Sequence, residues 1–314
     1  MNELNMEKLN GGLCGLVNFG ATCYLNSVLQ SFINNKNLLN NILNNNFEKN
    51  EKFIDKESLV DEIYKLLKGS WSENCVIVPK SLLITLSQID DNELNNQNDP
   101  DEYYEKILSR LYEETCHKLD VNVDDIEELY DKEWIKSFNK EFSFVNNNFY
   151  GLYKSEILCK SCGHKHLSFN PFISLKLELV SDNILSCLKS HLSWEDNITF
   201  TCDKCKTKDN AKKRLTLIKV PDTFVMTIKR YNNFVKKNNQ QINYSTDFTI
   251  DGNRYELYCI INHEGENTFC GHYTSYVKYI KDNNWYHIND NHISKVDINE
   301  IDSSDIYMLF YKKI

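Results

Sequence analysis

The sequence predicts an α+β fold in which a helical part is followed by a part built from β-strands. Up to about residue 140, apolar residues recur three or four positions apart, which is the spacing of one helix face. From about residue 148 onward, β-branched and aromatic residues alternate at period two. Helices and strands are therefore separated along the chain rather than interleaved, which is typical of α+β proteins.

The first helix is expected to begin at Cys23 and to end near Asn34. Its apolar stripe consists of Leu25, Val28, Leu29 and Phe32. A short apolar piece follows at 38–43. Further helices are expected over Glu57–Lys68 with Gly69 as C-cap, from Pro79 onward, from Pro100 with Asp99 as N-cap, and over Asp124–Phe138.

Six strands are expected in the second part. They are Phe172–Leu179, Phe224–Tyr231, Tyr255–Asn262, His272–Tyr279, Asn284–Asn289 and Ile306–Tyr311. The spacing of the last four fits an antiparallel arrangement with short loops.

The length and composition limit the number of domains and the kinds of protein that are possible. A chain of 314 residues with 41% hydrophobic residues can form one large domain or two ordinary ones. It has no apolar run of about 18 residues, and the segment from Met1 to Asn10 lacks the apolar core of a signal peptide. We therefore expect no membrane association, a cytoplasmic or nuclear location, and a monomer.

The formal net charge of −9 argues against nucleic acid as the main partner, because phosphate contacts need a basic surface. The lysine-rich run from Lys204 to Arg214 could be a nucleic-acid patch, but in so acidic a chain we interpret it as a solvated hairpin face.

Cys23 is a candidate nucleophile because it stands where a helix should begin. Unpaired N–H groups and the positive end of the helix dipole favour a thiolate at that place. A buried structural cysteine is the alternative, and this stretch alone does not decide between the two.

Two Cys-x-x-Cys pairs indicate a metal site. Eleven cysteines in a reducing compartment suggest metal binding or catalysis before disulfides. The two pairs, Cys159 with Cys162 and Cys202 with Cys205, supply four thiolates, enough for one closed tetrahedral Zn²⁺ site held between two hairpin tips. Four protein ligands leave no open position, so the ion would be structural. Redox-active pairs or unligated thiols are the alternatives.

A histidine and an asparagine could complete a catalytic group with Cys23. His272 follows Gly271 at the start of a strand, and Asn289 ends the strand after it. A hairpin through 281–283 would bring Asn289 back to His272. A Cys–His pair needs a third group that fixes the imidazole, and the amide oxygen of Asn289 can serve.

Four ordered motifs resemble the catalytic domain of the ubiquitin-specific proteases, a family of papain-like cysteine deubiquitinases. The stretch 15–27 (GLVNFGATCYLNS) is similar to the family's cysteine box, and 271–277 (GHYTSYV) with 285–290 (WYHIND) to its histidine box. The zinc-binding fingers of the family lie where this chain has its two cysteine pairs. A strand signature of the family follows them, and it matches 219–231 (KVPDTFVMTIKRY). The resemblance covers about residues 13–313.

The resemblance implies a hand-shaped single domain over 1–314. Its thumb would cover about 13–145, its fingers about 150–230, and its palm about 165–180 and 215–314. Cys23 would be the nucleophile, His272 the base, Asn289 its orienting partner and Asn18 an oxyanion donor. Asp290 could share the orienting role, since many relatives have Asp where this chain has Asn289.

The implied partner is ubiquitin. In 98–103 (NDPDEY), Asp99 and Glu102 match acidic positions of the family, where the Asp contacts the basic tail of ubiquitin; Gly271 and Tyr273 are further substrate-binding candidates. The expected function is hydrolysis at the C-terminal glycine of ubiquitin, with ubiquitinated proteins as substrates. A catalytically silent ubiquitin-binding scaffold and a protease for a ubiquitin-like modifier are the alternatives.

Overall fold

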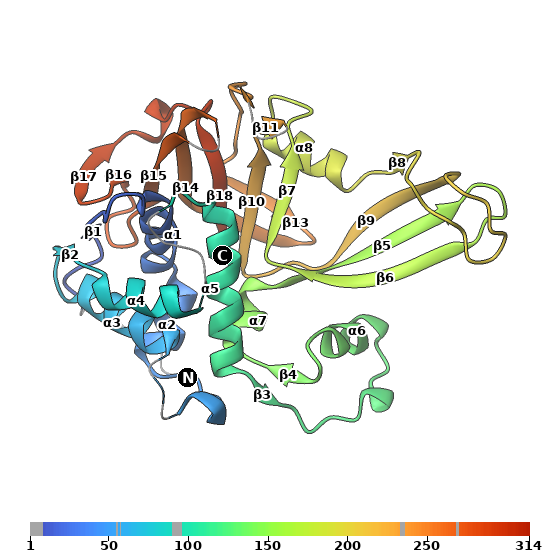
Figure 1. Cartoon of the computed structure of the whole chain (residues 1–314), viewed down its shortest axis with the longest axis horizontal. Helices are drawn as coiled ribbons and strands as arrows, with labels where there is room; N and C mark the ends of the chain where they lie inside the picture. The colour runs from blue at the N-terminus through green and yellow to red at the C-terminus, as the bar shows by residue number, and fades with distance from the viewer. Residues whose placement is uncertain (1–8, 55, 57, 90–95, 233–235, 268–269) are drawn as a thin grey trace.

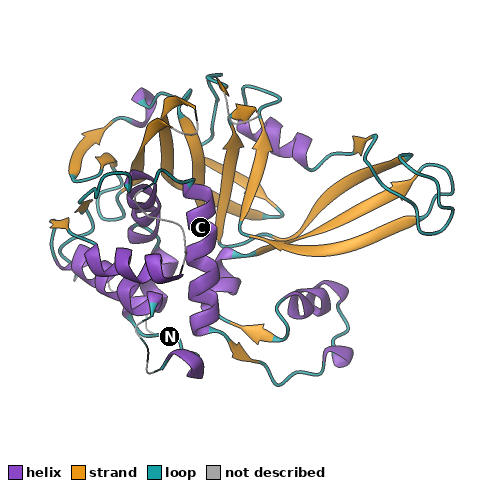
Figure 2. Ribbon diagram, viewed as in Figure 1, coloured by secondary structure: helices purple, strands orange, loops and turns teal. Residues whose placement is uncertain are grey.

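A computed structural model of the chain describes residues 9–54, 56, 58–89, 96–232, 236–267 and 270–314. Most of the helices gather on one side, a large sheet lies behind and beside them, and an arm of long strands extends away from both (Figures 1 and 2). The predicted α+β class is confirmed.

The helices of the first part are, in order, α1 (Cys23–Ile33), α2 (Lys36–Leu43), α3 (Leu59–Ser72), α4 (Lys80–Ile89), α5 (Pro100–Thr115), α6 (Leu129–Ser137) and α7 (Phe144–Phe149). Among them, helix α1 packs against α2, α3 and α5. The predicted start of α5 is confirmed, because the Asp99 side chain accepts a hydrogen bond from the Asp101 amide (2.8 Å) and Pro100 occupies the first turn. Within the described ranges, no helix has the length and apolar character that crossing a membrane requires.

Two helix boundaries differ from the prediction. Gly69 lies inside α3 rather than at its end, because the helix continues through a buried Trp71 that packs in the core. The expected helix over Asp124–Phe138 is a 3-10 turn at Val123–Asp125 followed by the shorter α6.

The central sheet has eight strands and contains all six predicted ones. Their bounds are β7 (Ser174–Glu178), β10 (Thr223–Lys229), β13 (Asp247–Ile250), β14 (Asn253–Asn267), β15 (Cys270–Lys278), β16 (Trp285–Asn289), β17 (His292–Val296) and β18 (Ile306–Lys313). The order is β17-β16-β15-β14-β18-β10-β7, with β13 beside β14. The β14–β15, β15–β16 and β14–β18 pairs are antiparallel as predicted, whereas β7 pairs with β10 in parallel.

The extended arm is a separate four-stranded sheet in the order β6-β5-β9-β8 (Figure 1). Its strands are β5 (Gly151–Cys159), β6 (Lys165–Phe172), β8 (Glu195–Asp196) and β9 (Ala211–Lys219), and helix α8 (Ile184–His191) lies between β7 and β8 in the chain. Both cysteine pairs lie at the far end of the arm, because Cys159 ends β5 and Cys205 precedes β9.

Two short strands complete the surroundings of α1. They are β1 (Gly15–Leu16) and β2 (Val76–Ile77), which pair in parallel. The core continues on both sides of α1: the helix packs against β14, β15 and β16 on one side and against α2, α3 and α5 on the other. All eleven of its residues are buried, so the predicted apolar stripe is only one part of its buried surface. Cys23 is thus placed at the boundary between helices and sheet.

Candidate active site

Cys23 is the first residue of α1, and its side chain is 2% exposed. The preceding loop is fixed by Asn18, whose Oδ1 accepts hydrogen bonds from the backbone amide and the hydroxyl of Thr22 (both 3.1 Å). Gly20, with φ of +103°, permits the tight turn between them. The thiol therefore sits on a well-defined helix start, where first-turn N–H groups are free to face an anion.

His272 reaches Cys23 from β15. The predicted hairpin forms: β15 and β16 pair with Ser275 opposite Ile288 and Lys278 opposite Trp285. It brings Oδ1 of Asn289 to 2.7 Å from Nε2 of His272. Because an amide oxygen only accepts, Nε2 carries the hydrogen of this bond and the other ring nitrogen is left for Cys23.

The electrostatics around His272 favour the imidazolium. A hydrogen bond with Cys23, then one with Asn289 and the charges of Cys23 and Asp290, raise the pKa of His272 from its ordinary 6.5 to about 9, against the lowering effect of burial. The arrangement suits a thiolate–imidazolium pair, the form in which a cysteine is a strong nucleophile.

Asp290 contacts the other side of the site. It occupies the turn between β16 and β17 with φ of +51°, a left-handed conformation that Asp tolerates. Its carboxylate accepts from the amide nitrogens of Asn18 (2.9 Å) and Asn26 (2.7 Å), and it lies 3.8 Å from Nε2 of His272. Asn289 is therefore the hydrogen-bond partner of the imidazole, while Asp290 holds Asn18 and adds negative charge nearby.

Sequence reasoning missed two residues of this group. Asn26 lies on α1 three positions after Cys23, and a polar residue among the apolar ones there was an available signal. Gln97 donates from Nε2 to the carbonyl oxygen of Gly271 (2.6 Å), next to His272. This contact joins the segment before α5 to the start of β15, and no sequence pattern indicated it.

Gly271 has a packing reason to be glycine. A Cβ at this position would lie 2.1 Å from Nε2 of His263 and 2.9 Å from the carbonyl oxygen of Glu264. His263 is fully buried, and its burial lowers its pKa to about 4. The neutral ring thus fills the space behind the strand that carries His272.

The remaining substrate-binding candidates have different surroundings. The half-buried Asp99 caps α5 and accepts a hydrogen bond from the hydroxyl of Tyr307 (2.6 Å), and burial raises its pKa. Glu102 is exposed and pairs with Lys106 (2.9 Å). Tyr273 is buried with its ring 4.4 Å from that of His263.

The four cysteines of the two pairs meet at the end of the arm. Their sulfur atoms all lie within 4.8 Å of one another, with Cys159–Cys205 at 3.6 Å and Cys162–Cys202 at 3.7 Å. A tetrahedron with zinc–sulfur bonds of about 2.3 Å has sulfur atoms about 3.8 Å apart. The residues therefore fit a Zn²⁺ ion, and among the described residues this is the one group with such an arrangement.

Fold and site together define the class of papain-like, hand-shaped proteins, with a helical thumb, a β-sheet palm and fingers tipped by cysteines. Within that class, the chain belongs to the ubiquitin carboxyl-terminal hydrolase family, whose model matches residues 14–311.

Similar proteins agree with this assignment. Ubiquitin carboxyl-terminal hydrolase 2 of Bos taurus is 26% identical, and the match covers 96% of this chain and 55% of the relative. Ubiquitin carboxyl-terminal hydrolase Usp2 of Drosophila melanogaster is 29% identical, and the match covers 98% of this chain and 35% of the relative. The chain thus spans about half or less of these relatives. In contrast, ubiquitin carboxyl-terminal hydrolase 2 of Gallus gallus, 28% identical, is covered over 95% of its length.

Solved structures share the fold. A yeast SAGA DUB module matches with a TM-score of 0.77 at 22% identity, over 98% of this chain and 70% of that one. A SAGA module of Ubp8, Sgf11, Sus1 and Sgf73 bound to ubiquitin aldehyde matches with a TM-score of 0.75 at 22% identity, and the match covers 98% of this chain and 70% of that one.

Proposed function

We propose that the protein is a cysteine-type deubiquitinase that hydrolyses thioester, isopeptide or peptide bonds at the C-terminal glycine of ubiquitin. The observation that carries the proposal is the grouping of Cys23, His272 and Asn289 at the boundary of helices and sheet, with the imidazole hydrogen-bonded to Asn289 and its pKa raised chiefly by Cys23. Family membership and a structural neighbour that is bound to ubiquitin aldehyde support the choice of substrate.

In the proposed mechanism, the Cys23 thiolate attacks the glycine carbonyl carbon and forms a tetrahedral oxyanion. His272, which already holds the proton of the Cys23 thiol, gives it to the departing amine as the carbon–nitrogen bond breaks, and this leaves an acyl-enzyme. Water then attacks the thioester with His272 as base, and ubiquitin leaves with a free carboxylate. Asn289 keeps the imidazole in one orientation and tautomer throughout.

Asn18 is the proposed oxyanion donor. Its amide nitrogen has two hydrogens and donates one of them to Asp290. The loop contacts with Thr22 fix the direction of the side chain next to Cys23. A pre-oriented donor of this kind stabilises a developing oxyanion by about 2.7–4 kcal/mol.

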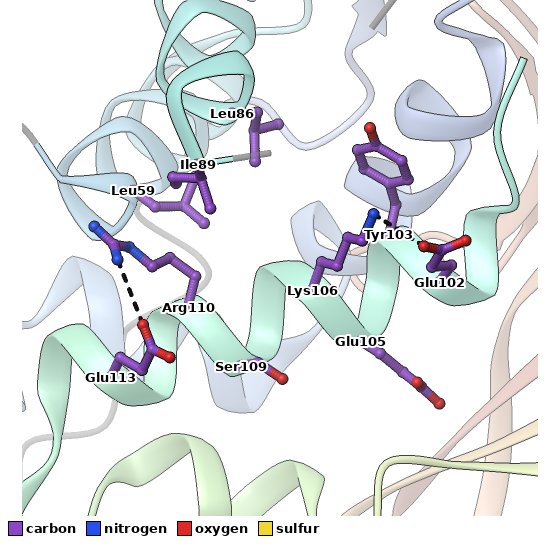
Figure 3. A pocket seen from close by; sticks show the side chains of 10 residues that line it. All are labelled: Leu59, Leu86, Ile89, Glu102, Tyr103, Glu105, Lys106, Ser109, Arg110 and Glu113. Atoms are coloured by element: carbon purple, nitrogen blue, oxygen red, sulfur yellow. Dashed lines mark hydrogen bonds and ion pairs between the residues drawn. The ribbon is translucent and has the colours of Figure 1, made fainter. Parts of the chain in front are cut away.

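We further propose that the thumb side of the site receives the basic tail of ubiquitin. Asp99 and Glu102 stand at the start of α5, whose exposed face lines a groove of about 480 Å³ together with Leu59, Leu86 and Ile89 (Figure 3). Three glutamates lie along this wall, Glu102, Glu105 and Glu113. Lys106 and Arg110 line the same groove and pair with Glu102 and Glu113, so arginine side chains of the tail would compete with these two cations for the carboxylates.

The proposed metal is one structural Zn²⁺ on Cys159, Cys162, Cys202 and Cys205. When bound, the ion would join the β5–β6 turn to the loop before β9 and so hold the end of the arm together. It lies at the far end of the arm, so no catalytic step involves it.

A ubiquitin probe with a C-terminal electrophile tests the function. We expect a covalent adduct with the intact protein, and none with Cys23→Ala. Cys187→Ala, which removes a buried thiol of α8, is the matched control and should still react. Folded protein that forms no adduct would contradict the proposal.

The two alternatives give different results in further assays. A silent scaffold would bind ubiquitin without hydrolysing a ubiquitin C-terminal amide. A protease for another modifier would react faster with the probe made from that modifier, and competition between probes separates the two cases.

A further inference from the structure

A second pair of cysteines lies close together, away from the four-cysteine cluster. The sulfur atoms of Cys14 and Cys75 are 3.4 Å apart, although 61 positions separate the residues. Each residue immediately precedes a strand of the small parallel sheet: Cys14 comes before β1 and Cys75 before β2. Neither is used in the proposed hydrolysis.

The strand register places the two backbones at the right separation for a disulfide. Gly15 pairs with Val76 and Leu16 with Ile77, so extending the register by one residue pairs Cys14 with Cys75. Neighbouring strands are about 4.8 Å apart, and disulfides join Cα atoms about 4.4–6.8 Å apart. The bond therefore needs no change of pairing.

Both cysteines are also held in place by hydrogen bonds. The carbonyl oxygen of Cys14 accepts from Nε2 of Gln30 on α1 (2.7 Å), and that of Cys75 accepts from the Gly15 amide (3.0 Å). The sulfur atoms must approach from 3.4 Å to about 2.05 Å. Side-chain rotation with small backbone adjustments can provide this approach.

The two thiols differ in their access to solvent. Cys14 is fully buried, whereas Cys75 is partly exposed. Burial and the neighbouring Cys75 raise the pKa of Cys14 to about 12. An oxidant from solvent therefore meets Cys75 first, and Cys14 is the partner that remains a thiol until a reactive sulfur forms beside it.

We propose that Cys14 and Cys75 are a modification site that a peroxide converts into a disulfide. The Cys75 thiolate attacks one peroxide oxygen, the O–O bond breaks, and the protonated leaving oxygen departs as water, which leaves Cys75 as a sulfenic acid. The Cys14 sulfur then attacks the Cys75 sulfur. Its proton and the hydroxyl leave as a second water, so two thiols and one peroxide give one disulfide and two waters.

The bond would stabilise the part of the thumb that leads to the nucleophile. It would close the chain from Cys14, just before β1, to Cys75, just before β2, into a loop that contains α1, α2 and α3. Leu16 of β1 donates its amide hydrogen to the carbonyl oxygen of Asp290 (2.9 Å), so the fixed strand is the one that joins the helices to the histidine side of the site.

The test uses the zinc-loaded full chain with Cys23→Ala, which removes the competing nucleophile. After treatment with stoichiometric hydrogen peroxide, we expect the intact mass to fall by two hydrogens and digestion to yield a peptide linking residues 14 and 75. The melting temperature should rise by roughly 5–10 °C, and dithiothreitol should reverse both changes. Adding Cys14→Ser or Cys75→Ser to this background should abolish the link and the rise.

Two results would overturn the proposal. One is a protein whose Cys14 and Cys75 stay unlinked under peroxide while other thiols of the chain are oxidised. The other is a melting temperature that rises equally in the Cys75→Ser protein, which would place the stabilising bond elsewhere. Because Cys75 is partly exposed, we expect the Cys75→Ser variant to fold. This variant therefore tests the proposal even if Cys14→Ser does not fold.

Discussion

Asn289 and Asp290 are adjacent in the chain, yet their side chains contact different parts of the site. Asn289 accepts a hydrogen bond from His272, so Asn289→Ala should lower kcat on the order of 10²-fold by releasing the imidazole. Asn289→Asp keeps an acceptor at the same place and should retain most activity. Steady-state hydrolysis of a ubiquitin C-terminal amide measures both, and equal losses for Ala and Asp would show that the acceptor does not matter.

Asp290 should act through Asn18, because its carboxylate holds the amide of that residue. Asn18→Ala should lower kcat about 10²–10³-fold by removing the oxyanion donor. Asp290→Ala should also lower kcat, and the loss in the double variant should be smaller than the sum of the two single losses, since the Asn18–Asp290 hydrogen bond is common to both changes. Fully additive losses in this double-mutant cycle would mean that the two residues act independently.

The raised pKa of His272 predicts a pH dependence. Its folded-state pKa of about 9 exceeds the ordinary 6.5, so its contribution to stability is fully present below 6.5 and is lost as the pH rises through about 9. The advantage of the wild type over His272→Ala in unfolding free energy should therefore shrink over that range. Urea unfolding at a series of pH values measures it.

An NMR titration of the His272 ring tests the cause of that shift. The hydrogen bond with Cys23 is the largest cause, so the midpoint should lie near pH 9 in the wild type and clearly lower in Cys23→Ala. A wild-type midpoint near 6.5 would contradict the thiolate–imidazolium pair.

At the scale of elements, Gly69 is a glycine within a helix. It lies in α3, and a Cβ there would lie 3.4 Å from Cδ1 of Ile77, the end of a flexible side chain. Since glycine is less favourable than alanine in helices, Gly69→Ala should raise the unfolding free energy by about 0.5–1 kcal/mol. Urea denaturation would show it. Gly12→Ala is the contrasting variant and should destabilise the protein, because φ at Gly12 is +114° and Trp71 lies 2.7 Å from the added carbon. If Gly69→Ala were destabilised instead, Ile77 would be unable to move aside.

Elements with strong local signals could be predicted from the sequence. The start of α5 depends on a cap and a proline that are adjacent in the chain, and the β15–β16 hairpin on a short turn between two alternating strands. The strands of the arm were not among the predicted ones. In β9 only Ala211 is fully buried, so the strand lacks the alternation of buried and exposed residues that identifies a strand.

At the scale of the whole molecule, the missed site residues depend on contacts between distant parts of the chain. Asn26 meets Asp290 across 264 positions, and Gln97 meets Gly271 across 174. No periodicity within a single element carries such information. The burial of α1 on all sides has the same origin, since the sheet covers one side and three helices cover the other.

The metal site also has a consequence for the whole molecule, because the arm extends away from the palm and the cysteines lie at its far end (Figure 1). We expect about one zinc per chain. Loss of the metal, through Cys202→Ser or a chelator, should weaken ubiquitin binding at least about tenfold, or about 1.4 kcal/mol. The rate at which a small alkylating agent modifies Cys23 should stay unchanged, because the active site is far from the ion. Metal analysis, a ubiquitin binding titration and the alkylation rate measure these effects, with Cys75→Ser as a cysteine control outside the cluster. Zinc clearly below one per chain, or full ubiquitin affinity after the metal is lost, would contradict a structural role for the four cysteines.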